Sequence, residues 1–199
     1  MFSPWIGKNW GNPANQLGGR KILLLGESHY SREEEAGQAD PDGTLRTFDL
    51  YVLGDRSLPF FTKLLQTVLG RKKHSMTARE IQDFWDSVAF YNYVPVYVSE
   101  GPRTSPTNEM FESGAAPFNL VMDRLKPEIV VVSGHRLWWW VLKNDGYRDD
   151  PTKLDSFTID TALAVKIKHP STGFSSGHWH SVLKTHLHEL EQAGRALDV

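Results

Sequence analysis

The stretch Lys21–Tyr30, KILLLGESHY, carries the clearest structural signal in the chain. Within it the apolar residues Ile22–Leu25 run without alternation into Gly26. Such a run is typical of a strand buried on both faces, as in a parallel sheet. Gly26 allows a sharp turn or a close approach to a ligand, because it has no Cβ. The polar residues Glu27–Tyr30 are then expected at the carboxyl end of the strand, where open α/β sheets bind their ligands.

The composition is that of a globular chain. With 199 residues, 40% of them hydrophobic, the chain has the size of one domain, and we expect a single domain over 1–199 with an irregular arm over 1–20. The absence of cysteine excludes disulfides, thiolate zinc sites and cysteine-ligated iron–sulfur clusters, and it fits a reducing compartment. No apolar run approaches the ~18 residues of a membrane span, and the N-terminus has no signal-peptide core. We expect a cytoplasmic monomer without membrane contact.

The rest of the chain alternates between strand-like and helix-like segments. Strands are predicted over 88–93, 128–133 and 162–167. Helical spacing of apolar residues is found over 60–69, 77–85, 118–125, 135–142 and 177–193. The polar segments 31–56 and 143–157 are expected to be loops. This order predicts an α/β fold, a three-layer α/β/α sandwich around a central, mainly parallel four-stranded sheet.

Smaller signals indicate where some helices begin and end. Thr77 and Glu80 have the spacing of a capping box. A helix or a helix pair is expected before Lys126, and in a pair Pro117 would lie in the first turn of the second helix. Gly70 and Gly194 are expected just past the ends of their helices.

Three predicted strands end in a side chain that can take part in chemistry. Glu27 follows the first, Asn92 closes the second and His169 follows the last. These ends share one edge of a parallel sheet, so we expect the three side chains in one crevice. A carboxylate can orient a water or stabilise a cation, and a histidine can act as acid, base or hydrogen-bond donor. The asparagine amide has a donor and an acceptor in one plane, which suits the edge of a nucleobase or another amide.

Four short motifs, in this order, resemble the uracil-DNA glycosylase superfamily, in the branch whose first motif has a Gly-Glu turn. They are LLLGESHY, AFYNYVPVYVSEGPRTSPTNE, PEIVVVSG and HPSTGFSSGHW, and together they extend over about residues 21–190. One departure is that His29 stands where a proline is usual.

The resemblance implies a role for each matching residue. Glu27 would serve the attacking water and the cationic sugar, and His169 would stabilise the charge on the departing base. The residues implied in base binding are Gly26, Ser28, Tyr30 and Asn92. The residues implied in DNA binding are Arg103, Ser171 and Phe174.

The function expected from the resemblance is that of a metal-independent DNA glycosylase without a cofactor. It would flip uracil or another modified base out of DNA and hydrolyse the N-glycosidic bond, leaving an abasic site. The net charge of −2 does not by itself indicate a nucleic-acid partner, although a local basic surface remains compatible with it.

Three alternatives remain open. One is a glycosylase for bulky modified bases in viral DNA, which would serve in phage defence. Another is a non-catalytic member of the fold that binds DNA or a nucleotide, although the intact set Glu27, Asn92 and His169 argues against it. The last is a metal-dependent hydrolase built on the histidines of the last helix. His178 and His180 do not lie on the same face of a helix, and neither do His186 and His188, so each is a poor pair of metal ligands.

Overall fold

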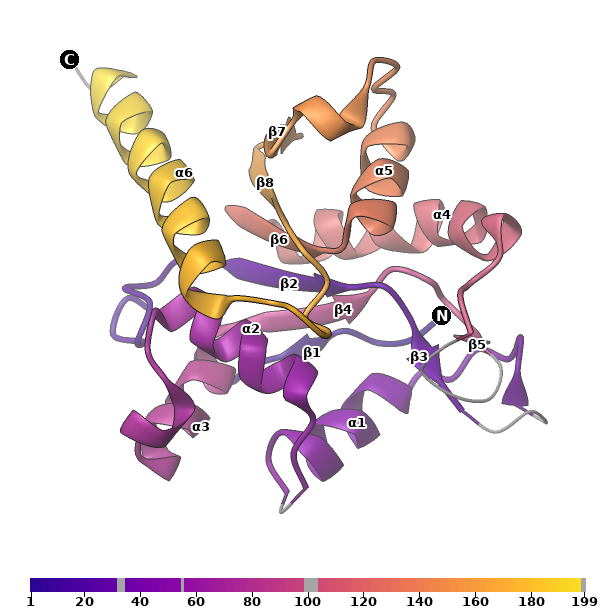
Figure 1. Ribbon diagram of the computed structural model, residues 1–199, viewed down its shortest axis with the longest axis horizontal. Coiled ribbons are helices and arrows are strands. Elements are labelled where there is room, and N and C mark those ends of the chain that lie inside the picture. Colours follow the sequence, from indigo (N-terminus) through magenta and orange to yellow (C-terminus); the bar gives the residue numbers. More distant parts are fainter. Residues whose placement is uncertain (32–34, 55, 99–103, 198–199) are drawn as a thin grey trace.

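Four parallel strands form the middle of the sheet, and each is a segment that the sequence predicts as a strand (Figure 1). The computed structural model describes residues 1–31, 35–54, 56–98 and 104–197. The central strands are β4 (Ala89–Asn92), β2 (Ile22–Gly26), β6 (Ile129–Ser133) and β8 (Ala162–Ile167), in this spatial order. They are almost entirely buried, which explains their apolar sequences without alternation.

Two further strands flank this centre in the antiparallel direction. β1 (Trp5–Ile6) pairs with β4, and β7 (Ser156–Ile159) pairs with β8. In the described residues the sheet is therefore six-stranded and mixed, and the expectation of four strands is wrong. β1 has only two residues within a segment rich in Gly, Asn and Pro, too short for any periodicity. β7 is only partly buried and begins in a polar segment that we expected to be a loop.

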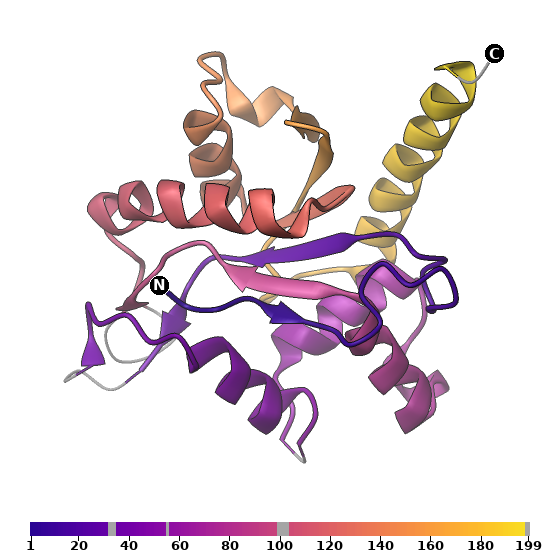
Figure 2. The same cartoon turned by 180° about the vertical axis from the view of Figure 1, so that it is seen from behind.

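Helices cover both faces of the sheet, as the sandwich prediction requires (Figures 1 and 2). One face carries α4 (Asn108–Leu125) and α5 (His135–Asn144). The other carries α1 (Gly43–Tyr51), α2 (Pro59–Leu69), α3 (Ala78–Ser87) and α6 (Ser176–Leu197). Short 3₁₀ turns lie at Lys73–Ser75 and Pro151–Lys153.

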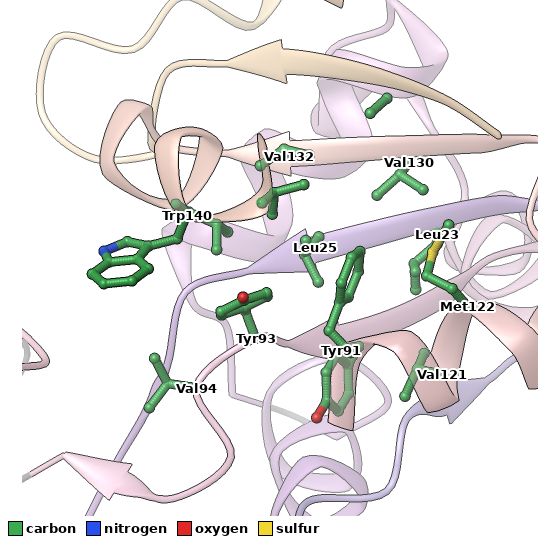
Figure 3. Packing of buried hydrophobic residues seen from close by; sticks show 14 of the residues in the cluster. Leu23, Leu25, Tyr91, Tyr93, Val94, Val121, Met122, Val130, Val132 and Trp140 are labelled. Atoms are coloured by element: carbon green, nitrogen blue, oxygen red, sulfur yellow. The ribbon is translucent and has the colours of Figure 1, made fainter. Parts of the chain in front are cut away.

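Alternate residues of each central strand face the two helical layers. Figure 3 shows Leu23 and Leu25 of β2 on the same side as Val121 of α4 and Trp140 of α5. Leu24 belongs instead to the core on the other side of the sheet. A strand that supplies two cores is apolar at nearly every position, because both of its faces are removed from water.

The capping signals at Thr77 and Gly70 are confirmed. The Thr77 hydroxyl accepts a hydrogen bond from the Glu80 amide at 3.2 Å, and the Glu80 carboxylate accepts one from the Thr77 amide at 2.7 Å. Gly70 ends α2 in the left-handed conformation, with φ 67°.

Three other expectations about helices are wrong. Segment 31–56 contains α1, which the turn-like residues Pro41 and Asp42 obscured. Of the two arrangements left open, α4 is the single helix, and Pro117 lies in its interior and not in a first turn, since an apolar stripe on both sides of the proline packs on the sheet. α6 continues past Gly194 to Leu197. No helix in the described ranges is long and apolar enough to cross a bilayer.

Candidate active site

A cavity of about 420 Å³ lies at the carboxyl edge of the parallel strands. Its lining residues are Glu27, Ser28, His29, Tyr30, Thr47, Tyr51, Leu58, Phe60, Phe61, Phe90, Asn92 and His169. The volume falls in the range of about 300–1,000 Å³ that is usual for small-molecule sites. The cavity brings together the side chains of Glu27, Asn92 and His169, which the sequence predicts to meet. Ser28 and Tyr30 line it as well.

The position of Asn92 depends on the absence of a side chain at Gly26. The two residues are register partners in the parallel pair of β2 and β4. A Cβ on Gly26 would lie 2.1 Å from Oδ1 of Asn92. The pairing continues beyond the strands, because the Val94 amide donates to the Glu27 carbonyl at 2.9 Å. The turn that carries Glu27 is thus fixed against the segment that follows Asn92.

The amide of Asn92 is free to bind a ligand. The residue is 5% exposed, and its side chain has no hydrogen-bond partner among the described residues. The hydroxyl of Ser28 is likewise buried without a partner in the described part of the chain. Because buried polar groups in folded proteins are nearly always hydrogen-bonded, two such groups in one cavity indicate that a ligand or water completes them.

Glu27 is half-buried at the end of β2. Burial raises the pKa of its carboxyl group, and the positive charge of Arg136 opposes this rise. Arg136 lies in the first turn of α5, with its guanidinium 4.6 Å from the centre of the Phe111 ring. Within the described residues no hydrogen bond reaches the Glu27 carboxylate, so it can accept protons or face a developing cation.

His169 lines the cavity from the turn that follows β8, and the residue remains partly exposed to solvent. Its carbonyl accepts a hydrogen bond from the Ser171 amide at 2.7 Å, and its ring centre is 5.5 Å from that of Phe60. Partial burial lowers the pKa of its imidazole, and the nearby charge of Lys63 lowers it further. Both effects favour the neutral ring at neutral pH, which can donate one hydrogen bond.

Aromatic side chains form much of the remaining wall, and most of them were not predicted as site residues. Phe60 and Phe61 come from the start of α2, and Phe90 comes from β4. Thr47 and Tyr51 come from α1, in the segment that we expected to be a loop. The spacing of Thr44, Phe48 and Tyr51 fits one face of a helix and could have indicated α1, but it does not show which residues face a cavity.

Two predicted DNA-binding residues lie outside the cavity lining, on the loop after His169. Ser171 is exposed, and its carbonyl accepts a hydrogen bond from the Lys63 ammonium. Phe174 is half-buried and stacks on Trp179, with ring centres 6.4 Å apart. Arg103 lies outside the described residues.

The histidines of α6 are separate from the cavity. Nδ1 of His180 is 2.9 Å from the Thr67 carbonyl, and Nδ1 of His186 is 3.1 Å from the Glu189 carboxylate. In the part of the chain that the structure describes, no three His, Asp or Glu side chains come together as a set of metal ligands. α6 therefore offers no support for a metal-dependent hydrolase.

No protein-family model matches this chain, and no curated protein matches it. A functional conclusion must therefore be drawn from the cavity itself.

Proposed function

We propose that this protein is a metal-independent DNA glycosylase of the uracil-DNA glycosylase type, acting on uracil or another modified base. The observation that carries the proposal is that Glu27, Asn92 and His169 line one cavity with aromatic walls. A carboxylate, an amide with no hydrogen-bond partner among the described residues, and a histidine with a lowered pKa are the groups needed to hold a base and cleave its bond to the sugar.

Base binding follows from the walls and from Asn92. An enzyme that acts on a base in duplex DNA must extrude the nucleotide, at a cost of a few kcal/mol. Aromatic side chains such as Phe60 and Tyr30 offer faces on which the extruded base stacks. The Asn92 amide then donates to and accepts from the edge of the base. The buried Ser28 hydroxyl provides one further polar contact.

Bond cleavage follows from the two titratable groups. The C1′–N bond breaks with its electron pair passing to the base, and the oxygen of water bonds to C1′. Glu27 orients that water, accepts its proton and offsets the positive charge that develops on the sugar. His169 donates a hydrogen bond to the base as negative charge develops there. Each interaction of this kind stabilises a transition state by on the order of 3 kcal/mol in a site that excludes water.

The proposal is tested by measuring the release of free base in the presence of EDTA. The substrates are duplexes that each carry one uracil, hypoxanthine, xanthine, hydroxymethylcytosine or glucosylated hydroxymethylcytosine. The last two address the phage-defence alternative, because the cavity is larger than a single pyrimidine ring requires. We expect free base and an abasic site from at least one duplex. DNA binding without release from any of them would contradict catalysis and favour the non-catalytic binder.

A further inference from the structure

Helix α1, which lines the cavity, has no side-chain cap at its N-terminus. It has nine residues, and the side chain of its N-cap residue Asp42 makes no capping hydrogen bond. Isolated helices shorter than about 12–15 residues are marginal in water, so tertiary contacts must hold α1 in place. Since Thr47 and Tyr51 of this helix line the cavity, those contacts also set the width of the cavity.

One of these contacts comes from the turn that carries Glu27. His29 lies two residues after Glu27, in the short strand β3 (His29–Tyr30), and is 6% exposed. Its Nε2 is 2.9 Å from Oγ1 of Thr44, which lies in the first turn of α1 and is fully buried. Both members of this hydrogen bond are removed from water, so loss of either one leaves the other unsatisfied.

The surroundings hold the imidazole rigidly. β3 pairs with β5 (Tyr97–Val98), with His29 opposite Tyr97. The ring of Phe2 packs edge-on against His29, with centres 4.6 Å apart, and against Tyr97 at 4.9 Å. The imidazole is buried, although His29 also borders the cavity, and this burial lowers the pKa of His29 to about 4. The ring is therefore neutral at neutral pH and suited to a fixed structural hydrogen bond.

The start of α1 is packed just as closely on the same group of residues. A Cβ on Gly43 would lie 2.5 Å from the Tyr97 hydroxyl and 2.7 Å from the Phe2 ring. The Tyr97 hydroxyl in turn donates to the Asp40 carboxylate at 2.9 Å. Little room is left for α1 to shift at this end while the bond between His29 and Thr44 is intact.

We propose that the hydrogen bond between His29 and Thr44 positions α1 as the wall that selects bases by size. His29 is then a positioning residue that acts through Thr44, and it has no part in the chemical step. The selection of bases depends on the proposed glycosylase function, whereas the anchoring of α1 does not. The anchoring of α1 and the selection of bases are therefore tested by separate measurements.

The anchoring is tested by amide hydrogen exchange in Thr44→Val, which keeps the shape of the side chain and removes the hydroxyl. We expect exchange in residues 45–51 to be about tenfold faster than in the wild type, the equivalent of one hydrogen bond, and exchange in α2 to be unchanged. Thr44→Ser should retain the wild-type rates. Thr67→Val is the matched control, because Thr67 is also fully buried but its hydroxyl has no partner in the described residues.

The size selection is tested by titrating the same proteins with uracil and with iodouracil. The quantity of interest is the affinity for iodouracil divided by the affinity for uracil. We expect this ratio to be severalfold higher in Thr44→Val than in the wild type. It should be unchanged in Thr44→Ser and Thr67→Val. Unchanged exchange in residues 45–51 of Thr44→Val would overturn the anchoring role. Faster exchange with an unchanged ratio of affinities would overturn the selecting role. If the wild type binds neither base, the size selection fails together with the proposed function, and the exchange rates still decide the anchoring.

Discussion

Gly26 and Asn92 face each other across two parallel strands so closely that only a residue without a Cβ fits at position 26. The added carbon would lie 2.1 Å from Oδ1 of Asn92 and 3.1 Å from the Phe90 ring. The strand end that introduces Glu27 and the amide that we propose to read the base are therefore one packed unit. A substitution at position 26 should therefore displace the side chain of Asn92.

Gly26→Ala tests this unit. Overpacking of this kind typically costs about 1–3 kcal/mol of stability, and here it also displaces the Asn92 amide. We expect a lower melting temperature and a loss of base release. Gly177→Ala is the control, because no atom of the described residues lies within 4 Å of a Cβ at that exposed position. It should leave activity intact, and a loss of activity equal to that of Gly26→Ala would argue against a specific effect on Asn92.

Asn92→Ala tests base recognition. The side chain is buried and makes no hydrogen bond within the described residues, so its removal leaves no hydrogen-bond partner unsatisfied among them. We expect a roughly tenfold or larger fall in kcat/KM, the equivalent of one hydrogen bond to the base, with little loss of stability. Asn119→Ala provides a comparison, since Asn119 accepts a hydrogen bond from Asn144 on the exposed surface, away from the cavity. If Asn92→Ala kept full activity and base preference, Asn92 would not read the base.

Arg136→Gln tests the charge state of Glu27 through the pH dependence of kcat/KM. Glu27 must be ionised to offset a developing cation, so activity falls as the pH drops through its raised pKa. Arg136 lowers that pKa, so its removal should move the acid limb of the profile to higher pH. Arg124→Gln, on the exposed end of α4, should leave the limb in place. A shift to lower pH in Arg136→Gln would contradict the electrostatic coupling.

His29 makes the stability of the protein depend on pH. Its pKa falls from 6.5 to about 4 on folding, so the unfolded chain binds the proton more readily between these values. The stabilisation from neutral His29 is complete above pH 6.5 and is lost as the pH falls toward 4. This amounts to about 3 kcal/mol, which urea unfolding at several pH values can measure. In His29→Gln the free energy of unfolding should fall by about 3 kcal/mol less between pH 7 and pH 4 than in the wild type. The control His188→Gln, at an exposed position, should lose as much as the wild type. Equal losses in all three proteins would show that His29 does not titrate in this way.

The parts of the fold that the sequence could predict are those with a strong local signal. The apolar runs of β2 and β6 and the capping box at Thr77 each determine their own structure. β1 could not be predicted, because its two residues form a strand only by pairing with Phe90 and Ala89 of β4. α1 was missed for a similar reason, since contacts with distant residues hold it.

The candidate site also has a part that could be predicted from the sequence and a part that could not. Glu27, Asn92 and His169 could be predicted because each stands where a buried strand ends, and parallel strands end at one edge. The walls could not, because Tyr51 and Phe60 reach the cavity through the packing of helices and not through a local pattern.

The most direct test of the central claim compares base release by the wild type with release by Glu27→Gln and Glu112→Gln, in EDTA. Burial raises the pKa of Glu27, so its charge costs free energy in the folded state, and Glu27→Gln should fold at least as stably as the wild type. Glu112 is exposed on α4 and serves as the matched control. We predict that Glu27→Gln releases base at least about 100-fold more slowly, while Glu112→Gln equals the wild type. Release by Glu27→Gln at the wild-type rate would contradict a catalytic role for this carboxylate and, with it, the proposed mechanism.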